Sequence, residues 1–244
     1  MPHRAFPLVA LLLLAGAPRA DDAGTLTIPT PRGAALQATH DQPNEPNGAA
    51  VVLAPGRGYH RGLPLLQESA AALTAAGFHV VRFDWAFFTA KGQPSGDLSV
   101  ELEDLDAAIA YARGIDGVRR VVLAGKSLGS IAALLRASAR SDDLAGVVLL
   151  TFPLHDPADE TKRFPESEKL AALELPSAVI TGDDDPACKL KPLYALAARC
   201  ARAPSIVIVP GDHSFKEGDD AAKAAANVRF AAQALVSWAR RRAG

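Results

Sequence analysis

The sequence predicts an α/β fold in which a mostly parallel central sheet carries helices on both faces. Short apolar runs rich in valine, leucine and isoleucine alternate along the chain with longer segments rich in alanine, leucine and charged residues. Nearly continuous apolar runs are typical of strands buried on both faces. Their regular alternation with helical segments favours a parallel sheet over an antiparallel one.

The strands are expected in two groups. Two edge strands, 25–28 and 35–40, come first and lead into a surface turn rich in proline and asparagine at 43–48. The alternating part of the chain then supplies the buried strands, which are expected at 50–54, 79–83, 120–124, 146–150, 178–180 and 205–209.

Helical spacing of apolar and charged residues predicts helices between these strands. They are expected at 63–76, 100–113, 128–139, 190–201 and 221–242. The segment 153–176 is different, because it is short and contains the charged stretch 156–169. It is too short and too polar for a large helical lid, so we expect an open pocket.

The first twenty residues are typical of a secretory signal peptide. His3 and Arg4 precede an apolar run, 6–17, and small residues follow. The run is shorter than the roughly 20 residues that span a membrane. An N-terminal core helix is the alternative. We expect a signal peptide at 1–20, a single domain at 21–244, periplasmic or secreted localisation, and no integral membrane segment in the mature chain.

Composition excludes several classes of protein. Hydrophobic residues make up 49% of the chain, and 26 basic residues face 27 acidic ones, for a net charge of −1. So apolar a chain is not intrinsically disordered. It also lacks the basic excess on which affinity for nucleic acid depends, so no nucleic-acid partner is expected.

Cys188 and Cys200 are the only cysteines. An oxidising compartment would permit a disulfide between them. A continuous helix over 190–201 would hold the two ends too far apart, because a disulfide needs Cα atoms within about 7 Å. Pairing therefore requires a helix that starts late, near Pro192. A disulfide and two free thiols both stay open.

The segment Gly125-Lys126-Ser127-Leu128-Gly129 matches G-x-S-x-G, a motif that places a serine on a tight turn between a strand and a helix. A predicted strand precedes it and a predicted helix follows, as the motif requires. A phosphate-binding loop is the competing interpretation, but it needs a glycine where Arg120 stands. Ser127 is therefore the candidate nucleophile.

A serine nucleophile needs a histidine base and a carboxylate that orients the histidine. Three aspartates, 183–185, follow strand 178–180, and His213 follows the last strand. Asp185 is the candidate acid because it stands before a proline, and Asp183 is the alternative. The aspartate run could instead be a solvated loop or a set of calcium ligands.

The expected oxyanion hole uses the backbone N–H of Leu128 and that of Arg57, with Gly58 as the alternative to Arg57. A plain turn is the other interpretation of the loop at 55–59. Trp85 follows a strand and could wall the pocket or belong to the core. The predicted substrate-pocket residues are Tyr59, His60, Trp85 and His155.

The motifs at 125–129, 152–155, 182–186 and 211–215 together resemble small α/β-hydrolases of the dienelactone-hydrolase-like group. Within that group the chain is similar to the family of testis-expressed protein thirty and the hydrolase-like part of subunit three of the NSL complex. The resemblance implies an α/β-hydrolase fold with Ser127, Asp185 and His213 as the triad. Pro55 stands where that family often has histidine, and Cys188 where glycine is frequent.

The sequence thus predicts an exported serine hydrolase that cleaves small or medium ester substrates through an acyl-enzyme, without metal or cofactor. Its expected partner is a small-molecule ester, and its oligomeric state is open. Two alternatives stand beside this prediction. One is a non-catalytic binding protein with the same fold, and the other is a peptidase or thioesterase with the same triad.

Overall fold

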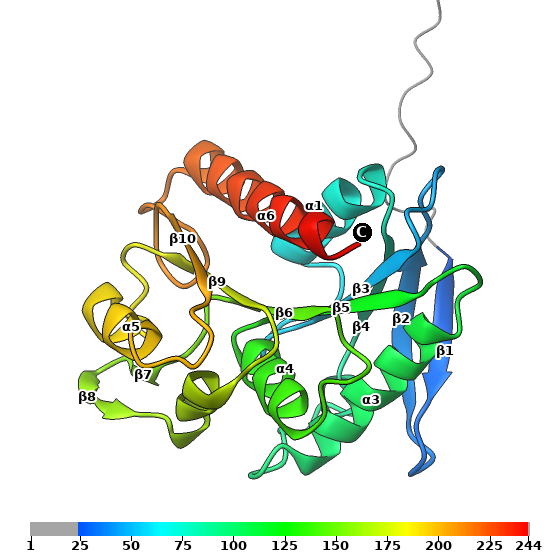
Figure 1. The fold of residues 1–244 in the computed structure, drawn as a ribbon, viewed down its shortest axis with the longest axis horizontal. Coiled ribbons are helices and arrows are strands. Elements are labelled where there is room, and N and C mark those ends of the chain that lie inside the picture. The colour runs from blue at the N-terminus through cyan, green and yellow to red at the C-terminus, as the bar shows by residue number, and fades with distance from the viewer. Residues whose placement is uncertain (1–23, 244) are drawn as a thin grey trace, which may run out of the picture.

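The computed structural model describes residues 24–243. The predicted signal peptide, 1–20, lies outside the described residues. The chain forms an eight-stranded sheet in the order β1-β2-β4-β3-β5-β6-β9-β10, with helices on both faces (Figure 1). No helix within residues 24–243 is both long and apolar enough to cross a membrane.

The strands of the sheet lie where the apolar runs predict them. Their bounds are β1 Thr25–Pro29, β2 Ala35–Asp41, β3 Ala49–Ala54, β4 His79–Phe83, β5 Arg120–Lys126, β6 Gly146–Leu150, β9 Ser177–Gly182 and β10 Ser205–Val209. β2 pairs antiparallel with both β1 and β4, and all other neighbours are parallel. The carboxyl ends of the parallel strands therefore share one edge, where ligand-binding loops of such sheets collect.

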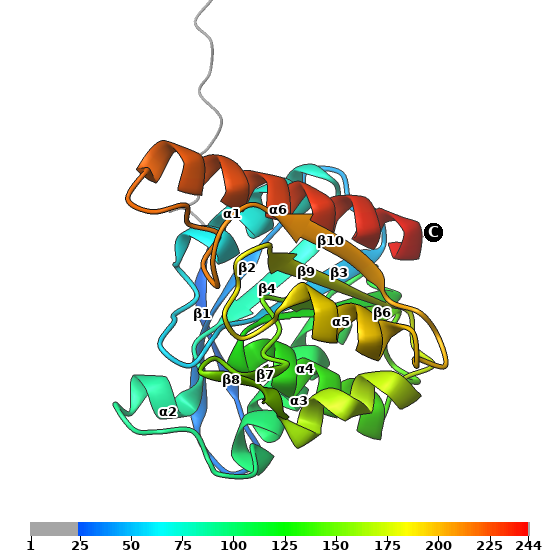
Figure 2. The same ribbon diagram turned by 90° about the vertical axis from the view of Figure 1, so that its left-hand side faces the viewer.

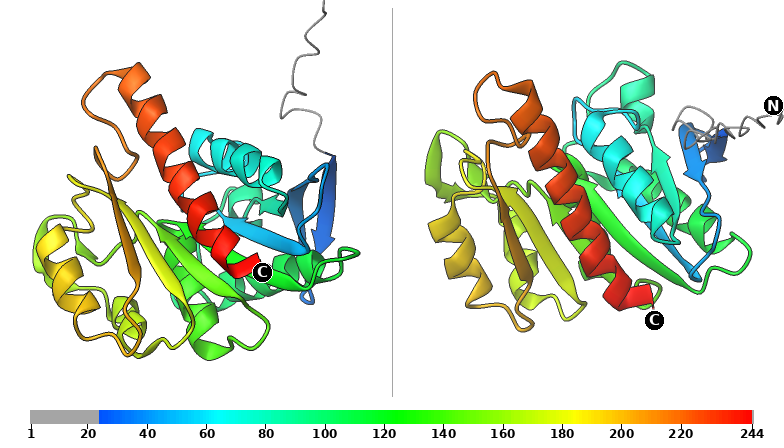
Figure 3. Two further views of the ribbon diagram at one scale, coloured as in Figure 1. Left: turned by 45° about the horizontal axis from the view of Figure 1, so that its top comes forward. Right: turned by 90° about the horizontal axis from the view of Figure 1, so that it is seen from above.

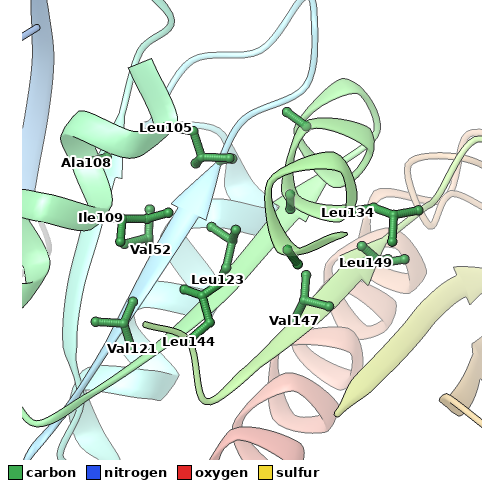
Figure 4. Close-up of a cluster of buried hydrophobic side chains, with 14 of the residues drawn as sticks. Val52, Leu105, Ala108, Ile109, Val121, Leu123, Leu134, Leu144, Val147 and Leu149 are labelled. Atoms are coloured by element: carbon green, nitrogen blue, oxygen red, sulfur yellow. The ribbon is translucent and has the colours of Figure 1, made fainter. Parts of the chain in front are cut away.

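The helices lie in two layers. Their bounds are α1 Pro64–Ala75, α2 Ala86–Thr89, α3 Ser99–Arg113, α4 Leu128–Ala139, α5 Leu190–Ala197 and α6 Ala221–Ala243. Helices α1 and α6 lie side by side over one face of the sheet (Figure 3). Helices α3 and α4 cover the opposite face, and Figure 4 shows Leu105 of α3 near Leu123 of β5 and Leu134 of α4 near Leu149 of β6.

Alternate residues of each central strand serve the two layers. Val52 of β3 packs in the core beneath α3 and α4, whereas Val51 packs in the core beneath α1 and α6. On β5, Leu123 faces α3 and α4, and Val122 and Ala124 face α1 and α6. This alternation also decides toward which face of the sheet Lys126, the last residue of β5, points.

The segment between β6 and β9 forms small elements that the sequence pattern did not predict. They are a hairpin of β7 (His155–Asp156) and β8 (Asp159–Arg163) and a 3-10 helix, η2 (Pro165–Ala172). Figure 2 faces the side of the molecule that carries this hairpin and α5. These elements are short, so the fold carries no large lid, as expected.

Helix α5 ends at Ala197, four residues before the predicted end at 201. The chain turns there, and the N–H of Ala201 bonds to the carbonyl of Ala171 in η2. The helix begins at Leu190, before Pro192, so the late start that a disulfide would need does not occur. Cys188 is buried, Cys200 is half-buried, and both thiols are free.

Candidate active site

Ser127 occupies the sharp turn between β5 and α4. Its backbone has φ 53° and ψ −117°, a conformation that few non-glycine residues adopt. Its N–H donates to the carbonyl of Leu150 on β6, and its carbonyl accepts from the hydroxyl of Ser130 at 2.6 Å. These bonds hold the strained turn, so the serine hydroxyl stands at the carboxyl edge of the sheet.

The two glycines of the motif are required by close backbone contacts. A Cβ at position 125 would lie 2.1 Å from the carbonyl oxygen of Gly129. A Cβ at position 129 would lie 2.5 Å from the carbonyl oxygen of Ala54. Only glycine allows β5, α4 and the end of β3 to approach so closely, which is the physical reason for G-x-S-x-G at this turn.

His213 and Asp185 continue a chain of hydrogen bonds from the serine. His213 lies in the loop after β10, and its Nε2 is 2.9 Å from Oγ of Ser127. Its Nδ1 is 3.0 Å from Oδ1 and 2.9 Å from Oδ2 of Asp185. The structure thus brings together three residues that lie far apart in the sequence, in the arrangement that sequence analysis predicts for them.

Asp185 is fully buried but well supplied with hydrogen bonds. Besides the His213 ring, its Oδ1 accepts the N–H of Ala187 at 2.9 Å, and its Oδ2 accepts the hydroxyl of Thr181 at 3.2 Å. These donors satisfy the hydrogen-bonding capacity of the buried carboxylate and fix its orientation toward His213. Asp183, the alternative acid, instead accepts the N–H of Gly211 at 2.8 Å and braces the histidine loop.

The predicted oxyanion donors lie around the serine. Leu128 is the first residue of α4, so its N–H has no carbonyl partner four residues earlier within the helix. A Cβ at Gly56 would lie 3.4 Å from Cβ of Ser127, so the loop that contains Arg57 and Gly58 passes directly beside the nucleophile. The side chain of Arg57 is exposed and donates to Gln93.

Two cavities meet at Gly58, beside this loop. One, of about 770 Å³, is bordered by Arg57 and the half-buried aromatic rings of Phe87 and Phe88. The other, of about 680 Å³, extends from Tyr59 toward the start of α6, and its lining is mostly apolar. Tyr59, a predicted pocket residue, therefore borders a cavity.

The other predicted pocket residues do not border either cavity. Trp85 is fully buried, and its indole N–H donates to the carbonyl of Pro55 at 2.8 Å, so it belongs to the core and braces the loop at 55–59, the predicted oxyanion loop. His155 is buried, with Nδ1 near the carbonyl of Asp156 and Nε2 accepting the N–H of Lys189. His60 is exposed and packs against Phe88. The pocket prediction is wrong for Trp85 and His155, because a buried side chain with satisfied polar atoms cannot contact a ligand.

Lys126 is a buried neighbour of the site that the sequence pattern did not single out. It is 1% exposed, and its Nζ lies 4.2 Å from the centre of the Tyr59 ring. Burial lowers the pKa of Lys126 to about 8, and the carboxylates of Asp185 and Asp212 partly offset this. The alternation along β5 was the signal that could have placed it, since it puts Lys126 on the same face as Val122 and Ala124.

Residues 24–243 contain no cluster of three or more side chains suited to hold a metal ion. The three aspartates at 183–185 do not form one, because each has a different task. Asp185 bonds to His213, Asp183 bonds to Gly211, and Asp184 is exposed beside Lys189. The chemistry that this arrangement can support is general-base activation of a serine hydroxyl.

Comparison with protein-family models gives one match over most of the chain. The family described as "Alpha/beta hydrolase domain" matches residues 47–240. This range contains the serine turn, both partner loops and the loop beside the two cavities. Among the described residues, 24–46 precede it, and they contain β1 and β2.

Solved structures with this fold are similar over nearly the whole chain. A lidless α/β serine hydrolase from Xanthomonas campestris has a TM-score of 0.68 at 22% identity and covers 91% of this chain and 95% of its own. Dienelactone hydrolase from Anabaena variabilis has a TM-score of 0.69 at 19% identity, with 90% and 97% covered. At such identities the similarity shows the fold alone.

A curated relative matches over a shorter range. The quorum-quenching protein AidA of Acinetobacter baumannii is 36% identical over 111 residues. The match covers 43% of this chain and 36% of that protein. The matched part is therefore little more than a third of the relative's length.

Proposed function

The chain belongs to the alpha/beta hydrolase domain family, and from that membership and the site geometry we propose that it is a serine hydrolase acting on carboxylic esters. Ser127 is the nucleophile, His213 the general base and Asp185 the acid that orients the base. The observation that carries the proposal is the continuous hydrogen bonding from Ser127 Oγ through His213 to Asp185.

In the first half of the reaction, His213 Nε2 takes the proton from Ser127 as Oγ attacks the ester carbonyl. The new C–O bond places a negative charge on the carbonyl oxygen. The N–H of Leu128 and an N–H of the Arg57–Gly58 loop stabilise this charge. As the tetrahedral intermediate collapses, His213 gives its proton to the leaving alcohol, and the acyl group stays on Ser127.

In the second half, His213 takes a proton from water, which attacks the acyl-enzyme. Collapse of the second intermediate returns that proton to Ser127 Oγ and releases the carboxylic acid. Asp185 stays ionised throughout. It holds the proton on Nδ1 of His213, so that Nε2 is free to accept, and it stabilises the imidazolium when Nε2 is protonated.

Open access to the site supports small or medium soluble esters as substrates. The cavities beside Gly58 each have room for a small organic group, and no large lid covers them. The Gly-Asp-His-Ser-Phe segment at 211–215 further supports placement near testis-expressed protein thirty and subunit three of the NSL complex. Quorum-signal molecules belong among the test substrates, because the partial relative is named a quorum-quenching protein.

Labelling with a fluorophosphonate probe tests the proposal. We expect the folded protein to be labelled on Ser127, and Ser127→Ala to abolish labelling and lower ester hydrolysis at least about a thousandfold. Ser141→Ala, which changes an exposed serine, is the matched control and should behave as the wild type. A folded wild type that is never labelled would indicate the non-catalytic binding protein instead.

A substrate panel separates the remaining alternatives. It should contain short acyl esters, the corresponding thioesters and short peptides, assayed at equal concentration. We expect kcat/KM to be highest for the esters. A clear preference for thioesters or peptides would reassign the substrate class while it leaves the nucleophile unchanged.

We also propose that the chain is exported. The pattern at 1–20 supports this, with a basic start, an apolar run and small residues. Expression of the full-length chain in a bacterium, followed by fractionation and N-terminal sequencing, tests it. We expect periplasmic or secreted protein that begins after Ala20, and a full-length cytoplasmic product would contradict export.

A further inference from the structure

Lys126 occupies a position on β5 that the fold otherwise fills with apolar residues. Val122 and Ala124, two and four residues earlier on the same strand face, pack in the core beneath α1 and α6. Lys126 continues this face, is 1% exposed, and directly precedes Ser127. A charged group is costly to bury in such a place without a partner, so its presence calls for an explanation.

The ammonium group of Lys126 has an unusual set of contacts. Its Nζ has no hydrogen-bond partner among residues 24–243. It lies 4.2 Å from the centre of the Tyr59 ring, within the range of a cation–π interaction, which becomes stronger when the pair is desolvated. The carboxylates of Asp185 and Asp212 are the nearby opposite charges.

Tyr59 in turn connects two loops of the site. Its hydroxyl lies 2.9 Å from Oγ of Ser214, the residue after His213. Its N–H donates to the carbonyl of Gly56, and its ring would lie 3.3 Å from a Cβ on Gly56. The ring therefore packs on the oxyanion loop while the hydroxyl reaches the histidine loop.

We propose that Lys126 and Tyr59 are positioning residues, which hold the oxyanion loop and the histidine loop in register with Ser127. This inference rests on the proposed function. The ammonium group fixes the ring from the nucleophile's own strand, and the ring and hydroxyl of Tyr59 fix the two loops. Neither side chain takes part in a bond-making step.

The arrangement has a consequence for pH dependence. A cation–π interaction requires the protonated amine, and burial lowers the pKa of Lys126 to about 8. Asp185 and Asp212 favour the charged form of Lys126. Glu68 of α1 and Lys216 border the cavity of about 680 Å³ that Lys126 also lines, and both are exposed. As the pH rises through about 8, Lys126 loses its proton and the positioning weakens, so kcat should fall.

Two substitutions at one position separate charge from packing. Lys126→Met keeps an unbranched side chain, one atom shorter, and removes the charge, and we expect kcat to fall about tenfold with KM changed less than about threefold. The decline of kcat above pH 8 should disappear in this variant. Lys126→Arg keeps a cation that does not titrate below pH 12, so it should retain most of kcat and also lose the alkaline decline.

Tyr59→Phe tests the second half of the connection. It keeps the ring over Lys126 and removes the hydroxyl that bonds to Ser214, so kcat should fall severalfold while the alkaline decline remains. Lys169→Met and Tyr194→Phe are matched controls at exposed positions and should behave as the wild type. Thermal unfolding of each variant verifies that it is folded.

Different outcomes overturn different statements. If folded Lys126→Met has the kcat and the pH profile of the wild type, the positioning role is wrong while the proposed hydrolase stands. If Lys126→Met lowers kcat but keeps the alkaline decline, the titrating group is another residue and the inference fails. A wild type without labelling or activity overturns the proposed function and this inference with it.

Discussion

At the scale of the residue, the site depends on polar groups held at the ends of apolar strands. Ser127 follows β5, Asp185 follows β9 and His213 follows β10. Each is fixed by a local cause. The absence of a Cβ at Gly125 and Gly129 allows the tight serine turn, backbone and hydroxyl donors hold Asp185, and Asp183 braces the loop of His213.

The two candidate aspartates can be separated by substitution. Asp185→Asn removes the charge that holds the His213 tautomer, so kcat should fall roughly 10³- to 10⁴-fold. Asp183→Asn keeps an oxygen that can accept the N–H of Gly211, so kcat of this variant should fall by no more than about tenfold. Steady-state kinetics on one ester measures both. A larger loss for Asp183→Asn would make Asp183 the acid.

The buried charge of Lys126 should lower the stability of the fold, although its proposed positioning role supports activity. The pKa of Lys126 is about 8 in the folded protein and 10.5 for the free side chain, so the unfolded chain binds this proton more tightly. Its cost to stability is therefore largest below pH 8 and fades as the pH rises toward 10.5. Lys126→Met removes this cost but also loses the cation–π contact. The net effect should be an increase in the free energy of unfolding at pH 7, on the order of 1–3 kcal/mol.

Urea unfolding of the wild type and Lys126→Met at pH 7 and at pH 9.5 measures this effect. The difference between the two proteins should shrink at the higher pH, because the wild-type amine is then mostly neutral. A variant that is less stable than the wild type at pH 7 would contradict the expected cost of the buried charge.

At the scale of the element, helix α4 is held by ion pairs as well as by its apolar face. Arg136 is buried on α4, and its guanidinium group bonds to Asp106 of α3 and to Asp143 in the segment before β6. It also donates to the carbonyl of Arg140, just past the end of the helix. The position of α4 matters because its first residue, Leu128, directly follows Ser127 and is the proposed oxyanion donor.

Removal of the Arg136 guanidinium should destabilise the fold. Arg136→Met leaves the buried carboxylate of Asp143 without its closest cation, and loss of one partner of a buried pair costs about 3–5 kcal/mol. Arg140→Met is the matched control, because Arg140 is more than half exposed and contacts the same two aspartates. It should cost less than about 1 kcal/mol. Equal losses in chemical denaturation would contradict the assignment.

At the scale of the whole molecule, the parallel sheet brings three distant loops to one edge and leaves them uncovered. The segment between β6 and β9 forms only the hairpin β7–β8 and η2, which are too short to make a large lid. Helices α1 and α6 cover one face of the sheet and α3 and α4 the other, so both faces are closed and the carboxyl edge is open.

The open edge predicts ordinary saturation kinetics. With no large lid to displace, hydrolysis of a short triacylglycerol should follow a single hyperbolic curve as the substrate concentration passes its solubility limit. A rate assay across that limit, with and without emulsified substrate, measures this. A sharp increase in rate once an interface forms would show that some segment does cover the site.

The strand–helix alternation, the glycine-flanked serine and the order serine, aspartate, histidine were enough to predict the parallel sheet. They were also enough to predict which serine, aspartate and histidine the fold brings together. Each of these depends on local sequence and on the rule that the carboxyl ends of parallel strands meet. The short elements α2, β7, β8 and η2 were not predictable, because each has too few residues to show a clear periodicity.

Only the tertiary structure decided which polar residues face a cavity and which are buried. Trp85 and His155 follow strands, as pocket residues often do, yet packing buries both and satisfies their polar atoms. Lys126 is buried against the Tyr59 ring because β5 turns it toward the α1 and α6 face. The sequence by itself determined which residue types lie at the ends of the strands and in which order, because both can be read from local patterns. Their burial and neighbours come from long-range packing, which local patterns do not encode.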